Sequence, residues 1–183
     1  LLKISPAAVE TAKNYKLLDS IYRIFKTFHE ELKLPCSVFV RQYGESRKNA
    51  VLSNFQLLFN LMLQWFCSPA ALLVEDKQCV ALTQLIVQIW PWLGHSSSLR
   101  LLILQTCAFA SERSLLVCSK FCSLQLNGSN SVLQLVLKSI TQQTGNIKAK
   151  SSSSSSVPLN GEDHHHLIII MGLRVLSNCC ACS

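Results

Sequence analysis

The sequence predicts an all-α fold built from stacked helices. Hydrophobic residues make up 49% of the 183 residues and charged residues only 15%, whereas about a quarter is usual in a soluble domain. Apolar residues recur at steps of three and four, which is the period of a helix, and no segment alternates as a half-exposed strand does. Glycine (6) and proline (5) are scarce, so the predicted helices have few interruptions.

The first predicted helix covers residues 7–33. Ser5 suits its cap and Pro6 its first turn. Its apolar stripe consists of Leu18, Ile21, Phe25, Phe28 and Leu32. We expect this helix to end at Pro35.

The second and third predicted helices cover residues 46–66 and 75–93. The second is apolar on so much of its circumference that we expect it to lie between other helices. Its stripe consists of Val51, Phe55, Leu58, Met62 and Trp65 with Phe66. In the third helix, Glu75 and Asp76 suit a helix start, and Pro91 should kink or end it.

The next predicted helices cover residues 98–110, 112–124 and 131–143. Ser111 is placed as the cap of the second of these, and Gly145 is expected to end the third. The helix over 98–110 is almost wholly apolar, which again indicates burial on several sides.

Residues 146–163 differ in composition from the rest of the chain. They contain six consecutive serines, then proline and glycine, and predict a mobile Ser-rich loop inserted between helices. A last helix is expected to begin near His164. Because the helical pattern resumes after the loop, we expect residues 1–183 to be a single helical segment, and we interpret it as a fragment of a longer chain.

A short pattern occurs twice. Residues 101–111 and 173–183 share L-x-[IV]-L-x-x-C-x-x-x-S, which aligns Cys107 with Cys179. Without the loop 146–163, the spacing is about 50 residues, near the length of armadillo and HEAT-type repeats. The pattern therefore predicts an armadillo/HEAT-like α-solenoid segment in which small cysteines lie at close helix contacts.

The alternative interpretation of these cysteines is a metal site. Cys179, Cys180 and Cys182 follow the histidines 164–166, and Cys118 lies one turn from Cys122. Zinc requires four ligands that converge, usually from C-x₂₋₄-C pairs on loops. Adjacent cysteines on a helix point about 100° apart, so we expect buried, reduced cysteines and no metal.

The sequence gives little support for catalysis or for binding of a cofactor or a small-molecule substrate. The chain has no phosphate-binding glycine loop and no recognisable hydrolase or metalloprotease motif, so we expect neither an enzyme nor a cofactor nor a small-molecule substrate. Residues 78–99 carry no formal charge, but glutamines and Pro91 interrupt them, so a core helix is favoured over a membrane span. No dense basic block accompanies the net charge of +7, which disfavours nucleic acid as a partner.

Protein partners remain the favoured class. Trp90 and Trp92 flank Pro91 and could form an aromatic anchor, although filling a helix corner is the simpler interpretation. A rival interpretation is a basic helical module that binds an acidic partner or nucleic acid. It predicts one patch containing Lys13, Lys16 and Arg23, with salt-dependent binding.

Three segments carry a resemblance to a known family. They are LLDSIYRIFKTFHEELKLPC (17–36), IVQIWPW (86–92) and GLRVLSNCCAC (172–182). They resemble the C-terminal region of the rotatin family, large armadillo-like proteins of centrioles and ciliary basal bodies. The resemblance implies a helical-repeat scaffold that supports centriole assembly and ciliogenesis, with centriolar proteins as partners. It also implies a cytoplasmic location at the centrosome and basal body, and it brings no catalytic residues.

Overall fold

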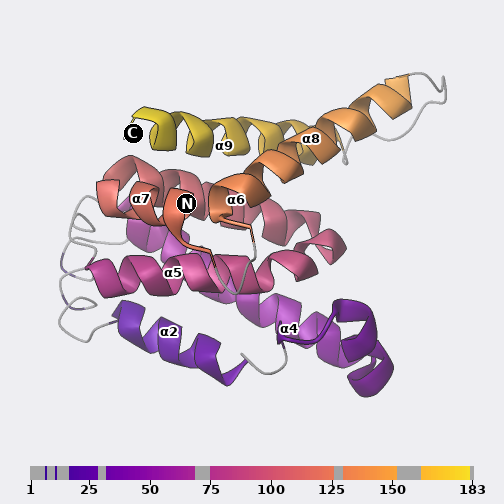
Figure 1. Ribbon diagram of the computed structural model, residues 1–183. Coiled ribbons are helices and arrows are strands. Elements are labelled where there is room, and N and C mark those ends of the chain that lie inside the picture. The colour runs from indigo at the N-terminus through magenta and orange to yellow at the C-terminus, as the bar shows by residue number, and fades with distance from the viewer. Residues whose placement is uncertain are drawn as a thin grey trace.

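The computed structural model describes residues 7, 11, 17–28, 32–68, 75–125, 130–151 and 162–181, and within these ranges it contains helices and no strand. The prediction of an all-α fold is therefore confirmed for the described residues (Figure 1). The elements are α2 (Leu17–Thr27), α4 (Cys36–Cys67), α5 (Asp76–Ile89), the 3₁₀ helix η2 (Trp90–His95), α6 (Ser97–Arg113), α7 (Leu115–Ser123), α8 (Val132–Ser151) and α9 (Glu162–Ala181).

The helices contact one another in two series. In the first, α4 packs against α6 and α6 packs against α9. In the second, α2 packs against α5, α5 against α7, and α7 against α8 (Figure 1). Helix α8 also lies along α9, and α7 touches both α6 and α9, so the two series form one shared core.

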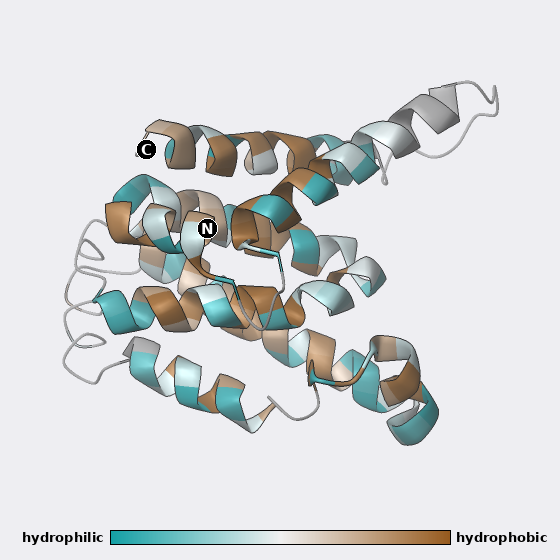
Figure 2. Ribbon diagram, in the orientation of Figure 1, coloured by the Kyte–Doolittle hydropathy of each residue, from teal (hydrophilic) through white to brown (hydrophobic). Residues whose placement is uncertain are grey.

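Phenylalanines join the first members of the two series. The ring of Phe25 in α2 stacks on Phe55 of α4, with centroids 5.3 Å apart, and lies 5.7 Å from Phe59. Phe25, Phe55 and Phe59 are buried, as the predicted stripes require. Burying a phenylalanine side chain stabilises the fold by roughly 1.5–3 kcal/mol, so this contact fixes α2 on α4. Figure 2 shows the complementary pattern, with hydrophilic residues concentrated on the outer side of α2.

The boundaries of the first two helices differ from prediction. Helix α2 ends at Thr27, and Phe28 is already in a turn, so no single helix covers 7–33. Leu32 is again helical, Lys33 and Leu34 are not, and Pro35 is the N-cap of α4. Proline favours a helix start because it lacks the N–H that the first turn leaves unused. Helix α4 then bends at Gly44, whose φ of 86° is open to glycine and strained for other residues.

Helix α5 ends where the sequence predicts an interruption. After Ile89 the chain continues as the 3₁₀ helix η2, and Pro91 lies in its first turn, where a missing N–H costs nothing. This change of helix type turns the chain sharply into α6. Ser96 caps α6 by accepting a hydrogen bond from the N–H of Leu99.

Ser111 is not the helix cap that the sequence predicts. It is buried inside α6, which runs to Arg113, and Ser114 caps α7 by accepting from the N–H of Val117. The aligned residues of α6 and α9 nevertheless share burial at two positions: Ile103 with Val175, and Cys107 with Cys179. Leu101 and Leu173, which the pattern also aligns, differ in burial. Leu101 is buried, whereas Leu173 is 52% exposed and no described helix covers it.

Gly145 and the first part of the predicted loop are helical. Helix α8 continues through Gly145 to Ser151, and its end projects beyond the other helices (Figure 1). Helix α9 begins at Glu162, close to the expected start at His164. The six residues 146–151, which include one serine, thus extend the helix beyond its packed part. The remainder of the predicted loop, residues 152–161, lies outside the described residues.

One described helix, α4, is long and apolar enough to cross a membrane, by length and composition only. Its qualifying window has a mean hydropathy of 1.2 and is 33% buried inside the protein. Core helices of soluble folds meet the same criterion. Helix α5, which covers the first part of the uncharged segment 78–99 and ends at Ile89, has only 14 residues.

Gly172 lets α9 approach α8 closely. A Cβ added there would lie 2.8 Å from Cγ1 of Ile140, whereas a Cβ at Gly145 of α8 would meet nothing. We predict that Gly172→Leu lowers the free energy of unfolding by about 1–3 kcal/mol, because the helices must separate. The matched control Gly145→Ala should raise it by about 0.5–1 kcal/mol through helix propensity. Urea unfolding followed by circular dichroism measures both, and an unchanged Gly172→Leu protein would contradict the packing of α8 on α9.

Candidate functional site

A cavity of about 290 Å³ lies where η2, α6 and α8 meet, and its lining is more polar than that of the hollow between α2 and α5. Residues of all three elements line it, together with the residue that precedes α8: Trp90, Leu93, Gly94, Arg100, Asn130, Leu135, Lys138, Ser139 and Gln142. Two of these residues are cationic and none is acidic. The arrangement can therefore attract an anionic group.

Arg100 is positioned by the turn from η2 into α6. It is half-buried one turn into α6, and its Nη2 donates a hydrogen bond to the carbonyl of Leu93 at 3.1 Å. The same carbonyl also accepts from the backbone N–H of Ser96 at 3.3 Å, so Arg100 adds a second hydrogen bond at the end of η2. Burial lowers the pKa of Arg100 from its usual value, and no carboxylate of the described chain offsets that cost.

Four residues of α8 complete one wall of the cavity: Leu135, Lys138, Ser139 and Gln142. Lys138 is exposed, whereas Ser139 and Leu135 face inward. The Ser139 side chain is 3% exposed, and its hydroxyl has no hydrogen-bond partner in the described structure. An unsatisfied buried hydroxyl costs about 1–3 kcal/mol, so a ligand that accepted its hydrogen bond would be favoured.

The two tryptophans predicted as partner anchors have different environments. Trp90 is half-buried and lines the cavity. Trp92 is fully buried, and its ring meets Phe39 of α4 edge-on, with centroids 4.9 Å apart. Trp92 therefore fills a corner of the core, which is the simpler of the two interpretations, and its ring is not exposed as an anchor in this structure. The two residues differ because η2 turns one towards α4 and the other towards α8.

Of the three residues of the predicted basic patch, the structure describes one, Arg23. Arg23 is exposed on α2, with its charge in solvent. Lys13 and Lys16 lie outside the described residues. Arg100 and Lys138, which lie together in the cavity, were not predicted. A signal for Arg100 does exist in the sequence, because it is the one charge within the apolar run 99–111, and a buried charge needs a reason.

A second hollow, of about 350 Å³, lies between α2 and α5. Its wall includes the ring of Tyr22, whose hydroxyl is buried and has no partner in the described structure. Burial, and then the neighbouring Cys79 and Asp19, raise the pKa of Tyr22. Lys26 is the one charged residue of this wall, and the hollow is mainly apolar.

Two buried cysteines of the described chain lie in environments that suppress thiol reactivity. Cys107 in α6 is fully buried, and burial raises the pKa of its thiol. Burial also raises the pKa of Cys179 in α9, with further contributions from Cys118 and Cys122 of α7. The thiolate is the reactive form and the metal ligand, so these shifts disfavour both chemistries.

The fold brings together three thiols that the sequence does not group. Cys179 of α9 lies beside Cys118 and Cys122, and the Sγ of Cys118 donates to the carbonyl of Ser111 at 3.1 Å. In the described part of the chain, no group of three or more histidines, cysteines or carboxylates has an arrangement that could hold a metal ion. Cys182 lies outside the described residues.

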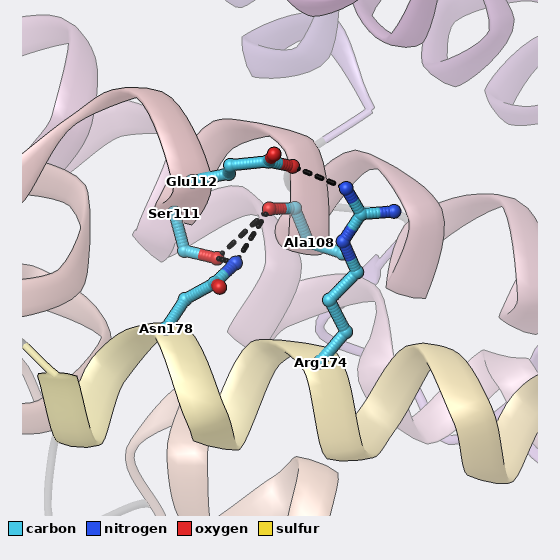
Figure 3. A network of polar contacts seen from close by, with 5 residues as sticks. All are labelled: Ala108, Ser111, Glu112, Arg174 and Asn178. Atoms are coloured by element: carbon cyan, nitrogen blue, oxygen red, sulfur yellow. Dashed lines mark hydrogen bonds and ion pairs between the residues drawn. The ribbon is translucent and has the colours of Figure 1, made fainter.

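A polar network fastens α9 to α6 (Figure 3). The Nδ2 of Asn178 donates to the carbonyl of Ala108 at 3.1 Å and to the hydroxyl of Ser111 at 3.0 Å. Arg174, one turn earlier, pairs with Glu112 and lies 5.0 Å from the centre of the Phe109 ring. Polar groups at a buried helix contact must match geometrically, so the network fixes the register of α9 on α6.

The Asn178 bonds predict a measurable cost. Asn178→Ala should lower the free energy of unfolding by about 1–3 kcal/mol, because it removes two partly buried hydrogen bonds. The matched control is Glu112→Gln, which breaks the exposed ion pair with Arg174 and should cost less than about 1 kcal/mol. Urea unfolding curves compare the two variants, and equal costs would contradict the assignment of the register to Asn178.

The cysteine environments predict selective alkylation. In the folded protein at pH 8, iodoacetamide should label the exposed Cys122 and Cys180 and leave Cys107 unmodified until urea unfolds the chain. Burial holds the Cys107 thiol protonated well above this pH, since its pKa is raised. Peptide mass spectrometry gives the extent at each site. Labelling of Cys107 as fast as Cys180 in the folded state would show that the α6 core opens readily.

Comparison with known proteins identifies one kind of relative. No family model and no solved structure matches the chain. The curated protein named rotatin homolog from Drosophila melanogaster is 30% identical over 186 aligned residues, which cover all of this chain and 9% of that relative. The chain thus spans less than a tenth of the relative's length. The resemblance to rotatin is confirmed, because the chain is similar to this relative over its whole length.

Proposed function

We propose that this chain is a segment of an armadillo- or HEAT-like α-solenoid that acts as a non-catalytic protein-interaction scaffold. The two series of helix contacts, α4–α6–α9 and α2–α5–α7–α8, are the observation that carries the proposal. In a solenoid, each helix packs on its equivalent in the next repeat, and the contacts of α4 with α6 and of α5 with α7 follow this pattern. A surface of stacked helices then binds partners along its length.

The similarity to a rotatin homologue supports a role in centriole and basal-body assembly and in ciliogenesis. In this role, the partners are centriolar proteins, the location is the cytoplasmic centrosome and basal body, and no cofactor or small-molecule substrate takes part. The binding surfaces are formed by exposed helix faces. Such faces occur on α9, where Ile170 and Leu173 are more than half exposed.

The second candidate is a basic helical module that binds an acidic partner. The net charge of +7 favours it, as does the cavity that places Arg100 near Lys138 without a lining carboxylate. Both candidates are binding functions, and they differ in the force that selects the partner. The affinity for an acidic partner should fall as the salt concentration rises, because salt screens charges. Binding through an apolar helix face should not fall in this way.

Proximity labelling tests the proposed function. The chain, fused to a biotin ligase and expressed in ciliated cells, should biotinylate centriolar proteins above the level of the ligase alone at matched expression. Fluorescence microscopy of the same fusion should show it at centrosomes and basal bodies. If no centriolar protein is enriched and the fusion is spread through the cytoplasm, the assignment to centriole assembly is wrong.

A further inference from the structure

The cavity between η2, α6 and α8 contains cations whose charge the described protein leaves unbalanced. Arg100 and Lys138 both line it, and neither forms an ion pair with a carboxylate of the described chain. Surface cations in proteins are commonly paired or fully solvated, but Arg100 is half-buried. A half-buried guanidinium without a counter-ion is stabilised when an anion enters beside it.

The geometry leaves Arg100 free to bind such an anion. One N–H group of its guanidinium is engaged with the Leu93 carbonyl, and this bond orients the planar group at the cavity wall. The guanidinium has five N–H groups in a fixed fork, so one such bond leaves donors for a bidentate contact with an oxyanion. The bond to the Leu93 carbonyl therefore explains the position of Arg100, but it leaves most N–H groups of the guanidinium available to a ligand.

Neutral donors surround the two cations. The buried Ser139 hydroxyl has no partner in the described structure, and the side-chain amides of Asn130 and Gln142 line the same cavity. A set of two cations, one hydroxyl and two amides is rich in donors. The complementary ligand is an acceptor-only group, which is a carboxylate or a phosphate.

We propose that this cavity binds one acidic side chain of a partner protein, with Arg100 and Lys138 contacting its oxyanion and the Ser139 hydroxyl donating a further hydrogen bond. The oxyanion is a carboxylate or a phosphoryl group, which share this chemistry. The inference rests on the proposed function as a protein-interaction scaffold and specifies the chemistry of one of its contacts.

The size and the walls of the cavity favour a side chain of a protein over other anions. Its volume of about 290 Å³ is at the lower limit of small-molecule pockets, which suits one side chain and its immediate neighbour. Trp90, Leu93 and Leu135 supply an apolar wall on which that neighbour can pack. Binding of a nucleic-acid strand would instead require a basic groove that follows several phosphates.

Fluorescence anisotropy with labelled peptides tests the proposal. The probes are a hexaglutamate peptide, a phosphoserine peptide with flanking glutamates, and a lysine-free neutral peptide of equal length. We expect the purified chain to bind at least one acidic peptide at physiological salt and not the neutral one. Tighter binding of the glutamate or the phosphoserine probe identifies the carboxylate or the phosphoryl group as the ligand.

Matched variants distinguish the cavity from general electrostatic attraction. Lys138→Gln should weaken peptide binding about tenfold, as loss of one charged contact does. The control Arg23→Gln removes the same charge from exposed α2, outside the cavity, and should leave the affinity within about twofold. Ser139→Ala keeps the net charge and should weaken binding about threefold. Because Arg100 also caps η2, Arg100→Lys is compared only after circular dichroism shows an unchanged fold.

Three outcomes would overturn the proposal. They are equal losses in Lys138→Gln and Arg23→Gln, unchanged affinity in both cavity variants Lys138→Gln and Ser139→Ala, and no binding of either acidic peptide at physiological salt. All three are measured on purified protein. They are therefore distinguishable from a failure of the centriolar assignment, which proximity labelling in cells reports independently.

Discussion

Burial of α6 on nearly all sides is the constraint on which the arrangement of this protein depends. Ten residues of this helix are buried: Leu99, Leu101, Leu102, Ile103, Leu104, Thr106, Cys107, Ala108, Ala110 and Ser111. A helix without a polar face cannot lie at a surface, so it needs neighbours on all sides. Helices α4, α7 and α9 supply them, together with η2, and their own stripes are buried as a result.

The helices that surround α6 must also match its few polar groups. Asn178 reaches the Ala108 carbonyl and the Ser111 hydroxyl, and Arg174 reaches Glu112 (Figure 3). Apolar contacts alone would allow α9 to slide by a turn at little cost, because leucines and isoleucines are interchangeable along a stripe. The polar contacts are directional, so they select one register. Close approach at Gly172 then places α9 firmly against α8.

The same packing creates the candidate site. The chain turns at Pro91, and that turn brings Trp90 and Arg100 to α8, where Lys138 and Ser139 complete the cavity. Cys107 and Cys179, which in sequence invite a metal or redox interpretation, are instead buried small residues at close contacts between helices. Residues that bind partners in a stacked-helix protein therefore need not carry a recognisable motif. They become a site only where two or three helices meet.

The helical class and the buried stripes could be predicted, because they depend on local period. Phe25, Phe55 and Met62 are buried as their spacing of three and four requires. Helix ends were predicted less well. Ser111 and Gly145, which were expected at helix boundaries, lie inside helices, and Pro35 begins a helix as its N-cap. Local propensities at such positions amount to about 1 kcal/mol, less than the burial of one large side chain.

The sequence by itself therefore determined the all-helical class, the faces that are buried, and the resemblance to rotatin, since each depends on residue type and spacing. Only the tertiary structure decided that Trp92 is buried while Trp90 lines a cavity, and that Arg100 lies near Lys138 across two helices. It also decided which thiols gather around Cys179. The physical reason is that a site made by residues far apart in the chain depends on the angle and register between helices. These follow from packing over the whole core, and no local pattern encodes them.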